Sequence, residues 1–236
     1  KVVVKGKSTV KVTASPAPPP PPSATGIPNT VVPTNAPAAS ATPDVPEQAY
    51  KWVTTWGTAE ERCDATDSAM PKMALTDTTV RQIIRVTTGG NKLRLRLSNQ
   101  YGKSDVEIHS LHLAKQIKAD ASTIDVSTDT PVTVNGEEEF IIPKGKVILT
   151  DEVEFPVEAL ENVAISAYFG AAPRDNITGH RGARATTYQV SGNQVSEERF
   201  SSAKTTTSWF FLADVSMWSP EDSRAVVCFG DSITDG

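Results

Sequence analysis

Alternation of apolar and polar residues constrains the fold of this chain more than any other feature. The run LRLRLS at 93–98 places leucine at every second position, which is typical of a strand with one buried face. Similar patterns recur at 106–113, 163–169, 186–190 and 209–212. No segment has the apolar period of a long amphipathic helix. About nine or ten short strands with Gly and Pro turns predict a mainly β, jelly-roll-like sandwich over 48–222.

Two hairpins are predicted within this region. Gly89-Gly90 lies in a tight turn that would fold the strand at 93–98 back onto a strand at 80–86. Asn135-Gly136 is a strong two-residue hairpin signal between 131–134 and 140–142. Glu137–Glu139 would then form only a charged hairpin tip.

A β-bulge is predicted near Ser110. Val106 and Ile108 alternate with polar residues, but the apolar phase slips before it continues at Leu111 and Leu113. An extra residue in one strand explains such a slip. His109 and His112 are expected to point to opposite faces of this strand and therefore not to share a metal ion.

The first 47 residues differ in composition from the rest. Residues 1–13 alternate Val with Lys or Thr and resemble the last strand of an upstream β-module. Residues 14–47 are rich in Pro, Ala, Ser and Thr, and an unbroken proline run at 18–22 favours polyproline II. We expect a linker here. Because the chain begins with Lys1 rather than Met, we expect a further domain before it, and we expect another after its C-terminal residues.

The composition excludes several classes of protein. The net charge is −5 without a basic cluster, so we expect no nucleic-acid partner. No apolar run approaches the ~20 residues of a membrane helix. The sequence contains no His/Asp/Glu cluster with metal-ligand spacing. Its two cysteines, Cys63 and Cys228, make neither a disulfide framework nor a metal site, and a single bridge between them is the less favoured alternative.

The C-terminal residues carry the clearest chemical signal. The apolar run Ala225–Phe229 predicts a buried strand, with Cys228 as a small core residue. Gly230 then ends the strand, and Asp231-Ser232 stands where a helix would begin. This pattern would place the Ser232 hydroxyl at the carboxyl edge of a parallel sheet, where α/β proteins hold their ligands. The alternative is a surface turn without chemical importance.

Other residues of the same turn limit its chemistry. Asp231 and Asp235 are expected to cap backbone N–H groups of the helix. A Gly-x-Ser-x-Gly nucleophile elbow is excluded, because Thr234 occupies the position of its second Gly.

The segment FGDSITDG at 229–236 resembles the first conserved block of the SGNH, or GDSL-type, esterases and acylhydrolases. The resemblance implies that Ser232 is the nucleophile and that its N–H contributes to the oxyanion hole, with Gly230 and Asp231 forming the supporting turn. The family's oxyanion Gly and Asn, and its triad His and Asp, belong to later blocks and match nothing here. Residues 223–236 would thus begin a truncated, flavodoxin-like α/β hydrolase domain that is inactive by itself.

A weaker resemblance covers the β-region. RQIIR at 81–85 and LRLRLSNQYG at 93–102, with TGH at 178–180 and TTY at 186–188, resemble the β-domain of secreted SGNH hydrolases similar to rumen xylan esterases. This implies an extracellular serine ester hydrolase that acts on an ester substrate such as an acetylated polysaccharide and needs no metal or cofactor. Two alternatives remain open: a carbohydrate-binding or surface-adhesion module, and a lipase or lysophospholipase of the same family.

Three further groups of residues have both a functional and a structural interpretation. His180 could contact a ligand or another domain, but we expect a loop histidine satisfied by backbone groups. The four tryptophans could form a sugar-stacking platform, but we expect them to pack in the core. They are Trp52, Trp56, Trp209 and Trp218, of which the first two are expected on one face of a strand. Four arginines could form an anion-binding face, but we expect them to lie on a solvated outer sheet face with acidic partners. They are Arg81, Arg85, Arg94 and Arg96.

Overall fold

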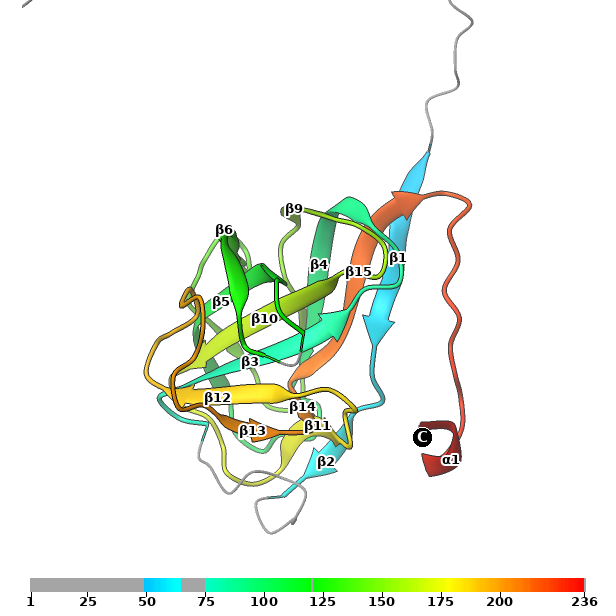
Figure 1. The fold of residues 1–236 in the computed structure, drawn as a ribbon. Coiled ribbons are helices and arrows are strands. Elements are labelled where there is room, and N and C mark those ends of the chain that lie inside the picture. The colour runs from blue at the N-terminus through cyan, green and yellow to red at the C-terminus, as the bar shows by residue number, and fades with distance from the viewer. Residues whose placement is uncertain (1–48, 65–74, 120, 236) are drawn as a thin grey trace, which may run out of the picture. The chain divides into compact units, whose positions relative to one another are not determined.

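Antiparallel strands are the main secondary structure of the residues that the structure describes. The computed structural model describes residues 49–64, 75–119 and 121–235. Within these ranges the chain forms fifteen strands and a single four-residue helix, with the strands arranged in three sheets (Figure 1). The predicted mainly β sandwich is therefore confirmed. The predicted upstream module end at 1–13 and the linker at 14–47 lie outside the described residues.

The first sheet has five strands in the order β1-β15-β4-β8, and β9 also pairs with β4. Its strands are β1 (Tyr50–Gly57), β4 (Gly90–Ser98), β8 (Val147–Leu149), β9 (Val153–Val157) and β15 (Leu212–Pro220). β15 lies between β1 and β4 and is antiparallel to both. The strand predicted at 93–98 is thus confirmed as part of β4.

The second sheet has seven strands in the order β13-β12-β3-β10-β5-β6, and β7 also pairs with β5. Its strands are β3 (Thr78–Arg85), β5 (Val106–Gln116), β6 (Ile124–Pro131), β7 (Phe140–Ile142), β10 (Asn162–Phe169), β12 (Thr187–Ser191) and β13 (Lys204–Thr206). A third, three-stranded sheet contains β2 (Glu61–Cys63), β11 (Ile177–Arg181) and β14 (Ser208–Phe210).

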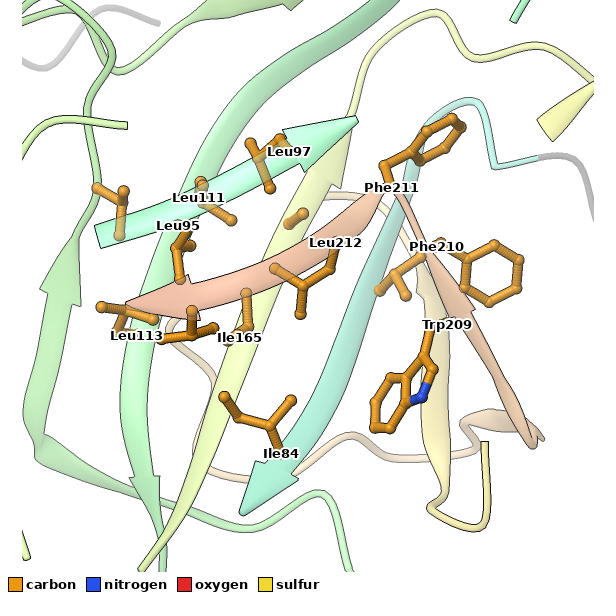
Figure 2. Packing of buried hydrophobic residues seen from close by; sticks show 14 of the residues in the cluster. Ile84, Leu95, Leu97, Leu111, Leu113, Ile165, Trp209, Phe210, Phe211 and Leu212 are labelled. Carbon is orange, nitrogen blue, oxygen red and sulfur yellow. The ribbon is translucent and has the colours of Figure 1, made fainter. Parts of the chain in front are cut away.

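The main core contains residues from all three sheets. The alternating leucines of β4, Leu95 among them, share one buried cluster with Leu113 of β5 and Ile165 of β10 (Figure 2). Phe210–Leu212 joins the same cluster where the chain passes from β14 into β15. Each fully buried aliphatic side chain contributes about 1.5–3 kcal/mol, so this packing is the main force that holds the sheets together.

The hairpin predicted at Gly89-Gly90 is wrong. β3 and β4 belong to different sheets and do not pair with each other. The two glycines are needed for close packing instead: a Cβ on Gly89 would lie 2.5 Å from the carbonyl oxygen of Val157, and one on Gly90 would lie 2.8 Å from that of Trp218. Turn formation and close backbone approach both favour glycine, so the sequence alone does not distinguish them.

The Asn135-Gly136 turn is confirmed, although its flanking strands pair elsewhere. Both residues have positive φ, 55° and 82°, as a type I′ turn requires. Val134 and Glu137 exchange backbone hydrogen bonds across the turn. Beyond that bridge, however, β6 and β7 each pair with β5 rather than with each other.

Two bulges change the direction of the side chains that follow them. The register between β10 and β5 shifts between Tyr168 and Phe169, opposite Ser110, which confirms the predicted bulge. A second shift between Thr54 and Trp56 in β1 was not predicted. Because an extra residue reverses the alternation of a strand, Trp56 leaves the face that Trp52 occupies. The predicted common face of these two tryptophans is therefore wrong.

Candidate functional site

The Gly-Asp-Ser turn forms a short capped helix. α1 (Ser232–Asp235) begins at the predicted nucleophile. The Asp231 carboxylate accepts a hydrogen bond of 3.0 Å from the N–H of Ile233, as a helix N-cap does, which confirms the capping expected of Asp231. A Cβ on Gly230 would lie 2.0 Å from Thr234 Oγ1, so only glycine fits at this position.

Ser232 is exposed at the start of α1. Among the described residues, neither its N–H nor its hydroxyl has a hydrogen-bond partner. A hydroxyl in this position is open to a substrate and to a general base. The turn therefore provides an accessible serine, and a base must be supplied by other residues before that serine becomes a good nucleophile.

The strand predicted before this turn is not formed. Ala225–Phe229 has no strand partner among the described residues, and Val226 and Phe229 are 92% and 99% exposed. A strand needs a neighbour to satisfy its backbone N–H and C=O groups, and this segment runs outside the sheets (Figure 1). Cys228, predicted to be a core residue, is likewise exposed, whereas Cys63 is buried. No disulfide joins these two described cysteines.

His180 holds the helix against the β-domain. It lies on β11, where its Nδ1 is 2.7 Å from the carbonyl oxygen of Ala59 and its Nε2 is 3.2 Å from Asp235 Oδ1. The backbone contact agrees with the expectation for His180, but its position on a strand does not. Asp235 does not cap the helix as predicted, because its carboxylate contacts this imidazole instead.

The two contacts define the tautomer of His180. A carbonyl oxygen only accepts hydrogen bonds, so Nδ1 carries a proton that it donates to Ala59. Nε2 can then donate to Asp235 only when the ring is doubly protonated. Both ring nitrogens face groups other than Ser232, so His180 in this arrangement is not the base that Ser232 requires.

An ion pair lies next to His180 on the same strand. The Arg181 guanidinium makes two parallel contacts with the Glu61 carboxylate: Nε to Oε1 at 2.8 Å and Nη2 to Oε2 at 2.5 Å. These hydrogen bonds lower the pKa of Glu61, against the opposing effect of its partial burial. The pair connects β11 to β2 and so keeps the strand of His180 in place.

Arg81 contradicts the predicted solvated outer face. Arg81 is fully buried on β3, under the segment that follows β12. Its Cζ lies 4.1 Å from the centroid of the Phe200 ring, on which the guanidinium stacks. Its guanidinium donates to Ser166 Oγ and to three backbone carbonyls, those of Ser122, Val195 and Glu197. Burial lowers the pKa of Arg81 to about 10, so the group stays charged at neutral pH.

The other three arginines of the predicted outer face have different surroundings. Arg96 forms an ion pair with the buried Asp214, as expected of a partnered outer face. Arg94 stacks on Trp52, with its Cζ 4.3 Å from the ring centroid. Arg85 is exposed at the end of β3. These positions do not form one anion-binding face, because Arg94 and Arg96 belong to the other sheet.

The four tryptophans divide into two pairs. Trp209 is buried and contacts Trp56 edge to face at 5.0 Å, in line with the expected core packing. Trp52 and Trp218 are direct cross-strand partners outside the core, with centroids 5.2 Å apart. Tyr50 stacks beside Trp218 at 6.3 Å. For this second pair the predicted core position is wrong, because Trp52 and Trp218 lie on the sheet face opposite to the buried Val53 and Met217 beside them.

The predicted bulge brings His109 and His112 to the same face, contrary to our expectation. His109 contacts the ring of Tyr168, and His112 lies opposite Ser166, on the same side of β10. His112 Nδ1 is 2.9 Å from Asp129 and 3.3 Å from Ser196. Asp129 and Ser196 thus both contact Nδ1 of His112. In a catalytic triad the acid and the nucleophile contact different ring nitrogens, so this set of residues is structural. No cluster of three or more metal-ligating side chains occurs within the described ranges.

Comparisons with known proteins do not assign the chain to a family. No family model matches the chain, and no curated protein matches it. Within the part of the chain that the structure describes, no helix has the length and apolar character to span a bilayer.

Proposed function

We propose that this chain is part of an SGNH-type serine esterase in which Ser232 is the nucleophile. The observation that supports this most directly is the geometry of the turn: an exposed serine is the first residue of a helix capped by the preceding aspartate. The Gly-Asp-Ser order matches the family's first block, and Gly230 permits the close approach that the turn needs.

The proposed reaction is acyl transfer. Ser232 Oγ attacks the ester carbonyl carbon, a new C–O bond forms, and the proton of Oγ passes to a histidine base. The ester C–O bond then breaks and the alcohol leaves with that proton. Water hydrolyses the acyl-serine, which releases the carboxylic acid and regenerates the hydroxyl. The Ser232 N–H is proposed as one oxyanion donor, and removing one such donor typically costs about 10²–10³ in rate.

The proposed substrate is an acetylated polysaccharide outside the cell. This substrate class and location depend on the resemblance to secreted xylan-esterase-like proteins. The base and its orienting acid are proposed to lie in the family's later motifs, because His180 is held by Ala59 and Asp235.

The test is ester hydrolysis by a chain extended through those later motifs. Ser232→Ala should abolish release of acetate from acetylated xylan and from a simple acetyl ester. Ser223→Ala, on the same C-terminal segment, is the matched control and should leave the rate unchanged. An active Ser232→Ala variant would disprove the assignment.

A second candidate, carbohydrate binding by the β-domain, has its own support. Tyr50, Trp52 and Trp218 form a ring cluster outside the core, and aromatic rings pack well against sugars. Substituting Trp218 by Ala should weaken retention on insoluble xylan without changing the esterase rate. Unchanged retention would remove this candidate.

A further inference from the structure

A cavity of about 300 Å³ opens where β12 separates from β3. The two strands pair from Ser191 opposite Thr78 up to Thr187 opposite Gln82. Before Thr187 the chain leaves the ladder, and the loop at 183–186 runs apart from Ile83–Arg85. The gap between these segments is the cavity, and it lies apart from Ser232.

The walls of the cavity have a distinct chemistry. Its lining includes Trp56 and the largely buried Trp209, whose rings contact each other edge to face. Two arginines, Arg85 and Arg184, also line it, and no described carboxylate does. In a chain with a net charge of −5, a cavity with only positive charge is a local exception that favours an anion.

Neither arginine of the cavity has a protein partner. Among the described residues, no hydrogen bond or ion pair involves the guanidinium of Arg85 or Arg184. Arg81, Arg96 and Arg181 in the same domain are all paired.

Arg85 and Arg184 reach the cavity from different segments. Arg85 ends β3, and Arg184 lies in the loop before β12, beyond the last paired residues Thr187 and Gln82. Arg184 also has a φ of 53°, in the left-handed region that a residue with a Cβ rarely adopts. An anion bound in the cavity would offset the positive charge of both guanidinium groups.

Two amide side chains complete the cavity. Asn162 Nδ2 donates to Gln116 Oε1 at 2.8 Å, and Gln116 Nε2 donates to the carbonyl of Ala121 at 2.7 Å. This chain of hydrogen bonds leaves Asn162 Oδ1 as an acceptor without a described partner. A bare, fully ionised anion has no donor for this oxygen, whereas a sugar hydroxyl does.

We propose that this cavity binds a hexuronate unit of an acidic polysaccharide. The two guanidinium groups hold the ring carboxylate, Asn162 Oδ1 accepts a hydrogen bond from a hydroxyl, and the indole of Trp56 packs against the C–H groups of the ring. The volume is at the lower end of that of small-ligand pockets, which fits one sugar ring. The site does not depend on Ser232 being a nucleophile.

Calorimetric titration of this chain with methyl glucuronoside and methyl galacturonoside tests the ligand class. At least one uronoside should bind saturably, and methyl glucoside, which has CH₂OH in place of the carboxylate, should bind about tenfold or more weakly. Acetate and inorganic phosphate should bind more weakly than the uronoside. Equal binding of the neutral sugar, equal binding of the small anions, or no uronoside binding would each overturn the proposal.

Matched charge-removing variants test the site. Arg85→Gln and Arg184→Gln should each lower uronoside affinity about fivefold to tenfold and leave the thermal unfolding curve in place. Arg224→Gln removes the same charge from an exposed arginine whose hydrogen bonds, among the described residues, go only to the carbonyls of Glu221 and Ser223. It should leave the affinity unchanged. An equal loss in Arg224→Gln, or no loss in the two cavity variants, would place the binding elsewhere.

Discussion

The strands between Tyr50 and Pro220 and the segment from 221 to 235 both contain apolar runs, but only the strands bury them. Val215 and Met217 on β15 are completely buried between β1 and β4. Val226 and Phe229, a few residues further on, are almost completely exposed. Both stretches have β-forming residues, so local propensity does not explain the difference. What differs is the presence of neighbouring strands that satisfy the backbone and cover the side chains.

The difference implies that the β-domain and the C-terminal segment depend on different interactions. The β-domain should lose stability when its buried contacts are removed. The segment is attached to that domain through few contacts, among them the pair between His180 and Asp235. Substitutions in the two regions should therefore have very different effects on the free energy of unfolding.

Among the substitutions of charged residues, Arg81→Gln should have the largest effect. The variant removes a buried charge that satisfies three carbonyls and Ser166, and glutamine cannot reach all of them. Such losses typically cost about 3–5 kcal/mol. Chemical denaturation would measure the change. Arg85→Gln, on the same strand but exposed, should change the unfolding free energy by less than about 0.5 kcal/mol. Similar values for both variants would show that the buried network contributes little.

Glu61→Gln should have a smaller effect. The pair with Arg181 has favourable two-point geometry, but its side chains are 33% and 39% exposed, so screening limits the loss to about 1 kcal/mol. Because the pKa of Glu61 is lowered in the folded state, its contribution is complete above the ordinary glutamate pKa of ~4.3. It is lost as the pH falls through the lowered pKa.

The pH dependence provides the control for this pair. The wild type should lose more stability than Glu61→Gln between about pH 6 and about pH 3, measured by denaturation at each pH. Parallel curves for the two proteins would mean that the ion pair does not stabilise the fold.

Specific residues show which features could be predicted from sequence. The bulge near Ser110 was predictable because the apolar phase slips visibly, and the Asn135-Gly136 turn was predictable because few other residues adopt its dihedral angles. The bulge at Thr54/Trp56 leaves no such slip in the sequence. The burial of Arg81 depends on carbonyls from distant segments that have no sequence motif of their own.

In the candidate site, too, local features are predictable from sequence and long-range contacts are not. The cap formed by Asp231 is local, and it was predicted correctly from the order of residues. The contact between Asp235 and His180 joins positions far apart in the chain, so no local pattern predicts it. The cavity at Arg85 and Arg184 depends on where two strands separate, which is a property of the sheet rather than of any short motif.

Asp235→Ala should act on the C-terminal segment alone. The variant removes the carboxylate that lies 3.2 Å from His180 Nε2, and partly exposed pairs of this kind contribute less than about 1 kcal/mol. Amide hydrogen exchange should become faster at Thr234 and Asp235, whose N–H groups bond to the carbonyl of Asp231, and remain unchanged in the strands. Faster exchange in β11 as well would show that the contact also supports the β-domain.

Phe229→Ser should have the smallest effect, although it removes a large apolar side chain. In the core such a change would cost about 3–5 kcal/mol. Here the ring is 99% exposed, so the free energy of unfolding of this chain should change by less than about 0.5 kcal/mol. Phe155→Ser, at a fully buried position on β9, is the matched control and should be severely destabilising. If Phe229→Ser were as damaging as Phe155→Ser, the C-terminal segment would pack on the β-domain in solution, and the contrast between the two regions would be wrong.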